Sequence, residues 1–323
     1  MADKKIIAVV GSTGSQGGGL AEAILSDPNG GFLVRAITRD PGKDKATTLA
    51  SKGAEVVKAD LDDVESLKRA FAGAYGVYAV TNFWEHFSGE KEKSQAKNIA
   101  DAAKAAGVKH VIWSTLEDTR SLMTPDDKRM PMLQEKYRVP HFDAKAEADA
   151  YFQGAPTTFL RTSFYWDNIY MFGLAPKPDD KGQYSWTFPM GTSKLAGMAA
   201  EDIGKAAYGI FKAGPQYIGK TLGIVGENLT LNEMSDKLAK GLGLSSVTYN
   251  AVDADVYRGF GFPGADEMGN MFQMYRDFEK EVLGARSAET TRHLNPQVQN
   301  FDQFVAKNKS KIQAATQPAP AAT

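Results

Sequence analysis

The chain has 323 residues, of which 42% are hydrophobic and 24% charged, and its 38 basic and 39 acidic side chains give a net charge of −1. This length allows about two domains with well-buried cores. The balanced charge argues against direct nucleic-acid binding, which requires basic side chains to displace phosphate counterions. The chain has no cysteine and only four, widely separated histidines, so we expect no disulfide, no thiolate nucleophile and no metal site.

No apolar run approaches the roughly 20 residues of a membrane span, and the chain shows no signal-peptide pattern. We therefore expect a cytoplasmic protein that does not associate with membranes, and leave access to the nucleus open. The oligomeric state is open as well, a homodimer included.

The first half of the chain alternates strand and helix patterns. Apolar runs typical of strands lie at 6–10, 32–38, 55–60, 76–80, 109–113 and 157–161, and helical patterns at 16–26, 44–52, 62–71, 89–106 and 141–152. A continuous apolar run such as 6–10 is typical of a strand buried on both faces of a parallel sheet. Strands separated by helical crossovers predict a doubly wound α/β fold.

This alternation stops after Thr162, where short segments, aromatic residues and Pro/Gly pairs dominate. We predict a Rossmann dinucleotide-binding domain at 1–162 and a smaller α+β domain at 163–312, with some of its segments returning to the sheet. Residues 313–323 lack core-forming side chains near their end, and we predict a disordered tail there.

The segment from Gly11 to Gly17, with sequence GSTGSQG, directly follows the first predicted strand and opens the first predicted helix. Glycines at such a turn allow the backbone to approach a pyrophosphate, which the N–H groups and dipole of the helix N-terminus then bind. The spacing is GxxGxxG rather than GxGxxG, but its place between a strand and a helix supports a dinucleotide site.

Arg39 ends the second predicted strand, 22 residues after Gly17, where NAD sites carry an acidic residue for the ribose 2′-hydroxyl. A guanidinium there suits a 2′-phosphate. The sequence therefore favours NADP(H) over NAD. The neighbouring acidic residue Asp40 argues against a phosphate site.

Two further segments follow predicted strands. Asp60 and Leu61 end the third strand, on the adenine side, and the segment Thr81, Asn82 and Phe83 ends the fourth. Doubly wound sheets bind ligands at the carboxyl ends of their strands, so both segments are candidates for cofactor contacts. An ordinary strand–helix loop remains the alternative for Thr81 to Phe83.

Motifs along nearly the whole chain resemble the NmrA-like family of atypical short-chain dehydrogenase/reductases, and its redox-sensor type in particular. They are GSTGSQGG at 11–18, TRDP at 38–41, TNFWE at 81–85, HFDAK at 141–145, YWDN at 165–168, and GFPGA at 261–265 with NMF at 270–272. The resemblance implies an NADP-binding Rossmann domain beside a smaller C-terminal domain.

Position by position, the resemblance implies three groups of cofactor contacts. The pyrophosphate loop would be Gly11, Thr13, Gly14, Ser15 and Gln16; Arg39 would hold the 2′-phosphate; Thr81, Asn82, Phe83, Lys145, Tyr165, Trp166, Asp167 and Asn168 would line the ribose and nicotinamide side. The redox-sensor type can carry a cofactor-contacting lysine where this chain has Ser94, and Lys93 or Lys97 is a candidate substitute.

Active short-chain reductases use Tyr-x-x-x-Lys on a helix and a serine at the preceding strand end. Here His141 stands at the tyrosine position, followed by Lys145, and Ser114 matches the serine. Imidazole titrates near neutral pH, so His141 is a candidate acid, with helix capping or a surface role as the alternative. Lys145 is expected to bind the ribose or to act as a base.

Two functions follow. The missing tyrosine favours an NADP(H)-binding redox sensor whose dinucleotide occupancy controls binding of a regulatory protein partner. The alternative is an NADPH-dependent reductase of a small apolar carbonyl, imine or quinone, supported by the aromatic residues of the second half. Met268, Met271, Phe272 and Tyr275 recur at helix-face spacing; we expect them in the core, with a substrate or partner surface as the alternative.

Overall fold

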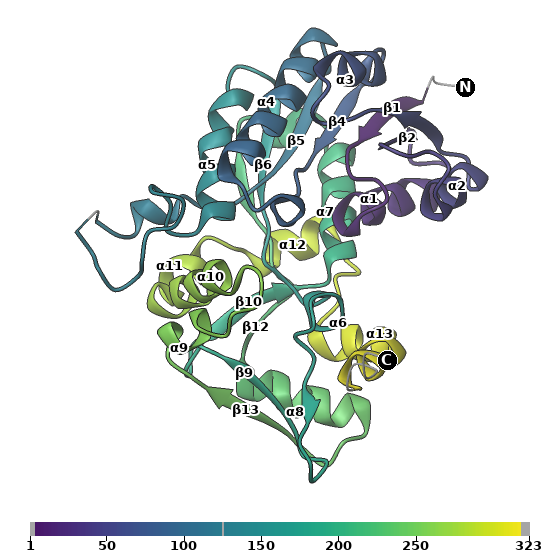
Figure 1. The fold of residues 1–323 in the computed structure, drawn as a ribbon. Helices are drawn as coiled ribbons and strands as arrows, with labels where there is room; N and C mark the ends of the chain where they lie inside the picture. The colour runs from purple at the N-terminus through teal and green to yellow at the C-terminus, as the bar shows by residue number, and fades with distance from the viewer. Residues whose placement is uncertain (1–3, 125, 318–323) are drawn as a thin grey trace.

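The computed structural model of the chain describes residues 4–124 and 126–317. A seven-stranded sheet in the order β11-β6-β5-β4-β1-β2-β3 dominates the first half, and each neighbouring pair of its strands is parallel (Figure 1). Its strands are β1 (Lys5–Val9), β2 (Phe32–Thr38), β3 (Glu55–Lys58), β4 (Gly76–Ala79), β5 (His110–Thr115), β6 (Thr157–Arg161) and β11 (Thr221–Gly223). This confirms the predicted doubly wound α/β fold.

Helices cover both faces of this sheet. They are α1 (Ser15–Leu25), α2 (Asp44–Ser51), α3 (Val64–Phe71), α4 (Gly89–Ala105), α5 (Pro140–Phe152) and α7 (Ala200–Lys212). The alternation of side chains along β1 shows the two layers: Ile7 and Val9 pack in the cluster that includes α1 and α7, whereas Ala8 and Val10 pack with α3, α4 and α5. Because β1 lies between β2 and β4, the strand order reverses there, which is where such sheets bind ligands.

Close packing of α1 against α7 accounts for two helical glycines. A methyl group on Gly19 of α1 would overlap the backbone of Glu201, and one on Gly204 of α7 would overlap the backbone of Leu20. The lack of side chains at these two positions lets the helix backbones approach each other. Gly19 therefore serves the packing of α7.

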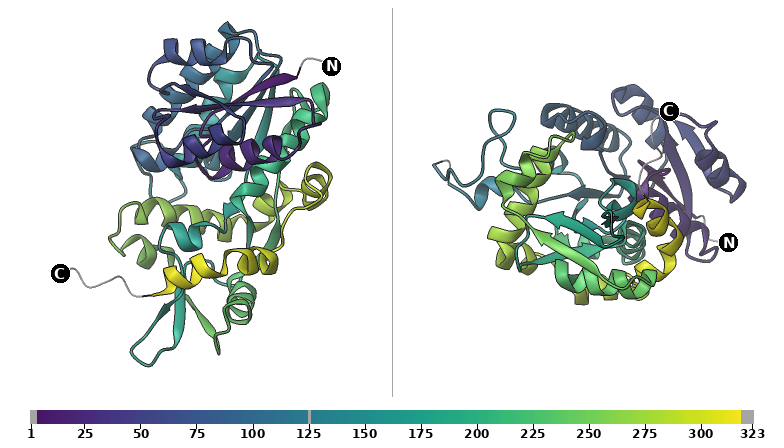
Figure 2. Two further views of the ribbon diagram at one scale, coloured as in Figure 1. Left: turned by 90° about the vertical axis from the view of Figure 1, so that its right-hand side faces the viewer. Right: turned by 60° about the horizontal axis from the view of Figure 1, so that its bottom comes forward.

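The second part of the chain holds two three-stranded sheets (Figure 2). The first is β12-β10-β7, with β7 (Phe164–Tyr165), β10 (Lys194–Met198) and β12 (Glu227–Thr230); the second is β13-β9-β8, with β8 (Lys177–Pro178), β9 (Tyr184–Phe188) and β13 (Val247–Ala251). Its helices are α6 (Asn168–Met171), α8 (Leu231–Leu242), α9 (Ala254–Arg258), α10 (Ala265–Asp277), α11 (Glu279–Gly284), α12 (Ala288–Leu294) and α13 (Phe301–Thr316). Short 3-10 helices lie at η1 (Phe83–Glu85), η2 (Thr119–Ser121) and η3 (Gly214–Tyr217).

Two segments of the second half belong spatially to the first. Helix α7 packs on the large sheet, and β11 pairs with β6 at its edge. The rest forms a separate core around Trp166, Phe272 and Phe301, below the large sheet in Figure 1.

The expected disorder of 313–323 is wrong for its first residues, because α13 continues to Thr316. Ile312 and Thr316 are buried, and Gln313 donates a hydrogen bond to the carbonyl of Leu242. These contacts with the second core stabilise the last turns of the helix. Residues 318–323 lie outside the described residues.

Over the described ranges 4–124 and 126–317, none of the helices combines the length and the apolar character needed to cross a lipid bilayer.

Candidate functional site

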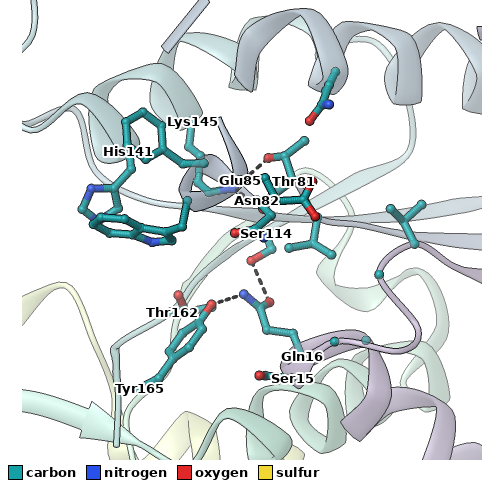
Figure 3. A pocket seen from close by; sticks show the side chains of 18 of the residues that line it. Ser15, Gln16, Thr81, Asn82, Glu85, Ser114, His141, Lys145, Thr162 and Tyr165 are labelled. Atoms are coloured by element: carbon teal, nitrogen blue, oxygen red, sulfur yellow. Dashed lines mark hydrogen bonds between the residues drawn. The ribbon is translucent and has the colours of Figure 1, made fainter. Parts of the chain in front are cut away.

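A cavity of about 500 Å³ lies at the carboxyl ends of the sheet strands, between the large sheet and the second part of the chain (Figure 3). This volume lies within the usual range for small-molecule sites. Most of the sequence-predicted site residues line it: Gly11, Thr13, Gly14, Ser15, Gln16, Gly17, Arg39, Asp60, Leu61, Thr81, Asn82, Phe83, Ser114, His141, Lys145, Tyr165 and Asn168.

One end of the cavity is the loop between β1 and α1. Gly11 adopts a left-handed conformation with φ of 65°, and its carbonyl accepts a hydrogen bond from the N–H of Gly14 at 2.8 Å. A Cβ on Gly17 would lie 2.5 Å from the carbonyl oxygen of Gly11 and 2.7 Å from that of Val10. Within the described chain, no side chain caps the N-terminus of α1, and its first turn carries no acidic residue. This tight, uncapped turn fits a pyrophosphate.

Gln16 extends from this loop into the centre of the cavity, as Figure 3 shows. Its Oε1 accepts hydrogen bonds from Ser114 Oγ at 2.9 Å and from the Tyr78 hydroxyl, and its Nε2 donates to the Tyr165 hydroxyl. Burial raises the pKa of Tyr165 to about 12 and also raises the pKa of Tyr78, so both phenols stay neutral near pH 7. Ser114, which matches the serine of active short-chain reductases, donates its proton to Gln16.

Lys145 projects from α5 into the cavity and contacts two residues, Glu92 and Thr81. Its Nζ lies 2.7 Å from Glu92 Oε1, and donates to Thr81 Oγ1 at 2.8 Å and to the Thr81 carbonyl at 3.3 Å. Thr81 Oγ1 in turn donates to Glu92 Oε1 at 2.6 Å. All three ammonium hydrogens of Lys145 thus have acceptors within the protein, which fix its position.

Sequence reasoning missed Glu92, whose side chain is fully buried. The spacing of α4 contains the signal: Glu92, Ala96, Ile99 and Ala103 recur at one-turn intervals and are all buried. Neither lysine considered as a substitute at Ser94 is in the cavity lining. Lys93 instead pairs with Glu90 and Glu147, and Lys97 pairs with Asp101.

Asp149 lies one turn after Lys145 on α5 and links the site to the core. Its Oδ1 accepts hydrogen bonds from Thr115 Oγ1 at 2.6 Å and from Trp113 Nε1 at 2.8 Å. Burial raises the pKa of Asp149 to about 6, and these hydrogen bonds and Lys145 only partly offset the effect.

This shift predicts a pH dependence of stability. The folded chain holds the Asp149 proton up to about pH 6, whereas the unfolded chain releases it near pH 4. The fold therefore becomes less stable as the pH rises through that range. Asp149→Asn should nearly match the wild type near pH 4 and exceed its free energy of unfolding by about 3 kcal/mol well above pH 6. Urea unfolding of both proteins across that range measures the difference, and a difference independent of pH would contradict the shift.

His141 occupies the first turn of α5, on the same helix face as Lys145 four residues later. Glu267 Oε1, from α10 in the second part, accepts the backbone N–H of His141 at 2.8 Å and also contacts its Nδ1. The imidazole lies beside the rings of Phe83 and Trp84, at centroid distances of 5.8 and 5.1 Å. Sequence reasoning did not identify Glu267, because an acidic residue in the first turn of a helix is equally explained by the helix dipole.

Arg39, directly after β2, also lines the cavity. Its side chain is 63% exposed, and its guanidinium bonds Glu85 of η1 at 2.6 Å. The neighbouring Asp40, whose charge would disfavour a phosphate, accepts a hydrogen bond from the N–H of Gly42. The exposed guanidinium fits a phosphate, provided that it leaves Glu85.

Two residues of the predicted segment Tyr165–Asn168 lie outside the cavity lining. Trp166 is buried in the second core, with its ring 5.2 Å from that of Phe301. Asp167 accepts the N–H of Ala200 at 2.7 Å, at the start of α7.

The remaining wall of the cavity is apolar and comes largely from the second part. It consists of Leu116, Phe142, Phe164, Met171, Phe172, Leu174, Met268, Met271 and Tyr275, with Trp84 of η1. Met171 and Phe172 are more than half exposed, so an apolar molecule entering here would cover them. Of the α10 stripe, Met268, Met271 and Tyr275 line the cavity, whereas Phe272 is fully buried in the core.

The NmrA-like family model matches residues 3–305 of this chain. The NmrA-like family domain-containing oxidoreductase FrzB of Cladobotryum sp. is 33% identical over 234 residues, which span 67% of each chain. The fold is similar to that of NmrA, a negative transcriptional regulator solved in complex with NADP, with 23% identity, a TM-score of 0.78 and 97% and 98% of the two chains covered.

Citrobacter sp. triphenylmethane reductase, solved with NADP(H), has the same fold, with 20% identity, a TM-score of 0.72 and coverage of 95% of this chain and 99% of that one. The family model extends over both the large sheet and the second part that together enclose the cavity. The chain therefore belongs to the NmrA-like family.

Proposed function

We propose that this protein is an NADP(H)-dependent oxidoreductase that reduces a small apolar carbonyl, imine or quinone. The observation that carries the proposal is the set of residues that line this cavity: a phosphate-type loop with Arg39, a wall of aromatic and aliphatic side chains, and Lys145. The curated relative FrzB is named as an oxidoreductase, and both NmrA and triphenylmethane reductase were solved with the phosphorylated dinucleotide.

The residues would share the binding of the dinucleotide as follows. The N–H groups at the start of α1 and the loop from Gly11 to Gly17 would bind the pyrophosphate. Arg39 would bind the 2′-phosphate, and Asp60 with Leu61 would border the adenine. Lys145, held by Glu92 and the Thr81 hydroxyl, would release its longest hydrogen bond, the 3.3 Å one to the Thr81 carbonyl, and donate to the nicotinamide ribose instead. Asn82 and Phe83 would complete that side of the site.

Bound NADPH supplies a hydride at its nicotinamide ring. The protein's own contribution is to position the acceptor against the apolar wall formed by Phe172, Met268 and Met271, and to exclude water from it. The raised pKa values of Tyr78 and Tyr165 keep negative charge away from the centre of the cavity.

The test is an NADPH-consumption assay with a panel of apolar quinones, cyclic imines and aldehydes. We expect turnover for planar apolar members of the panel, and much less for small hydrophilic aldehydes that cannot cover Phe172. A protein that binds NADPH but oxidises it with none of these classes would contradict the proposal.

Arg39 should determine the choice of dinucleotide. Arg39→Ala should weaken NADPH binding by roughly 10- to 100-fold, because a charge-assisted hydrogen bond is lost, and leave NADH binding unchanged.

Glu85→Gln should strengthen NADPH binding by up to roughly fivefold, since the exposed pair that competes for Arg39 is removed. Calorimetric titration measures both effects; equal affinities of the unmodified protein for NADPH and NADH would contradict the 2′-phosphate site.

A second candidate function, redox sensing through dinucleotide occupancy, is favoured by the Arg39–Glu85 pair. A 2′-phosphate that takes Arg39 releases Glu85, whose neighbour Trp84 packs near Gly264 in the second part. Occupancy would thereby change a surface that a regulatory protein partner could recognise. Hydrogen exchange of segments 83–88 and 260–267 should then differ between NADPH and NADH, and identical exchange would contradict the sensor.

A further inference from the structure

The first-turn histidine of α5 and a glutamate from the second part form a buried pair at the cavity wall. His141 and Glu267 are 7% and 3% exposed. Glu267 Oε1 accepts the backbone N–H of His141, which can only donate, and the same oxygen contacts Nδ1 of the ring. Because Glu267 Oε1 is an acceptor, it favours the tautomer of the neutral His141 ring that carries its proton on Nδ1.

The second ring nitrogen of His141, Nε2, is available to a bound molecule. Within residues 4–124 and 126–317, Nε2 of His141 has no hydrogen-bond partner, and the ring lines the cavity. In Figure 3 the imidazole lies at the same end of the cavity as Lys145. A bound molecule is therefore the partner that the geometry leaves for Nε2.

Three other candidate proton donors near the centre of the cavity are engaged or hold their proton tightly. Those of Lys145 go to Glu92 and Thr81, and that of Ser114 goes to Gln16. The phenol of Tyr165 has its pKa raised to about 12 by burial and releases its proton reluctantly. An imidazolium is a stronger acid than a phenol or an alcohol, and is therefore a better proton donor.

We propose that Glu267 is a positioning residue that orients His141, and that Nε2 of the protonated His141 ring donates the proton that completes reduction of the bound acceptor. This inference rests on the proposed reductase function. In a carbonyl or imine acceptor, the carbon takes up the hydride with its two electrons, and the oxygen or nitrogen of the same double bond takes up the Nε2 proton. In a quinone, the ring system takes up the hydride and a quinone oxygen takes up the Nε2 proton. The Nε2–H bond breaks, an O–H or N–H bond forms, and neutral His141 keeps Nδ1–H on Glu267 until solvent protonates Nε2 again.

The charges around His141 determine the direction of its pH dependence. Glu267 of α10 stabilises the imidazolium, and Lys145 of the same helix, already paired with Glu92 of α4, opposes it. Glu85 of η1 also lines the cavity but pairs with Arg39. Above the pKa of the imidazolium, the donor is lost and kcat/KM should fall tenfold per pH unit.

Glu267→Gln separates the geometric role of Glu267 from its charge. The amide oxygen can still accept both donors, but the negative charge is gone, so the falling limb of the kcat/KM profile should move by about one pH unit to lower pH. His141→Gln should remove the limb and lower kcat roughly 100-fold or more, with NADPH affinity retained. His293→Gln, at an exposed position, is the control and should change neither.

Nitrogen-15 NMR of the imidazole rings provides a readout that does not depend on turnover. The chain has only four histidines, so His141→Gln assigns the ring. We expect a protonated Nδ1 at high pH and a lowered pKa in Glu267→Gln. A ring with its proton on Nε2 would overturn the pair whether or not an acceptor is found. Full turnover by His141→Gln would overturn the donor role and leave the reductase function standing.

Discussion

Lys145→Met should lower the free energy of unfolding by about 3–5 kcal/mol and abolish productive NADPH binding. Glu92 is fully buried, and Lys145 is the cation that lies 2.7 Å from its carboxylate. Without Lys145, the buried carboxylate keeps the hydroxyl of Thr81 and, 3.6 Å from its other oxygen, Nε2 of His86. Breaking a buried pair in this way costs about this much. The loss of the ammonium also frees Thr81 and removes the expected ribose contact. Urea unfolding and calorimetric titration measure the two effects.

The double variant Lys145→Met/Glu92→Gln separates stability from function. Without the uncompensated carboxylate it should regain most of the lost stability, yet it should not regain NADPH turnover. Lys97→Met is the matched control, because its exposed pair with Asp101 should contribute nothing measurable. A Lys145→Met protein as stable as the wild type would contradict the buried pair.

Gly17→Ala should weaken NADPH binding at least tenfold and destabilise the fold by roughly 1–3 kcal/mol. The added methyl would lie 2.5 Å from the carbonyl oxygen of Gly11 and 2.7 Å from that of Val10. Both are backbone atoms of the loop itself, so the loop must move, and with it the N–H groups expected to bind the pyrophosphate.

Gly18→Ala is the adjacent control. Its methyl would meet only the carbonyl oxygen of Ser12, at 3.4 Å, so the helix should gain up to about 1 kcal/mol from the better helix former. Thermal unfolding with and without NADPH compares the two variants. Equal loss of NADPH binding in both would show that the contact at Gly17 is not the cause.

The large sheet was predictable because its residues carry local signals. The apolar run of β1 is buried on both faces, and the glycine turn after it does lie at the cavity. One residue of the predicted site lies elsewhere for a reason that the local sequence does not show. Trp166 follows β7 and is buried in the second core against Phe301, a packing partner 135 residues further along the chain.

The partners of the central residues were not predictable in the same way. Glu92 is 53 residues from Lys145, and Glu267 is 126 residues from His141; no local pattern identifies such pairs. They depend on how α4 and α10 pack against α5, which is a property of the assembled fold. The helical periodicity of α4 places Glu92 on its buried face but does not name its partner.

The central claim is that NADPH and an apolar acceptor share this one cavity and exchange a hydride in it. Mass spectrometry of the product formed with NADPH deuterated at its transferable position tests this claim most directly. It uses the carbonyl or imine acceptor that gives the highest turnover, because a hydroquinone keeps no carbon-bound deuterium. The account predicts one deuterium at the reduced carbon in the unmodified protein and none with Lys145→Met/Glu92→Gln. NADPH oxidation without deuterium in the product, or no oxidation with any acceptor, would contradict it.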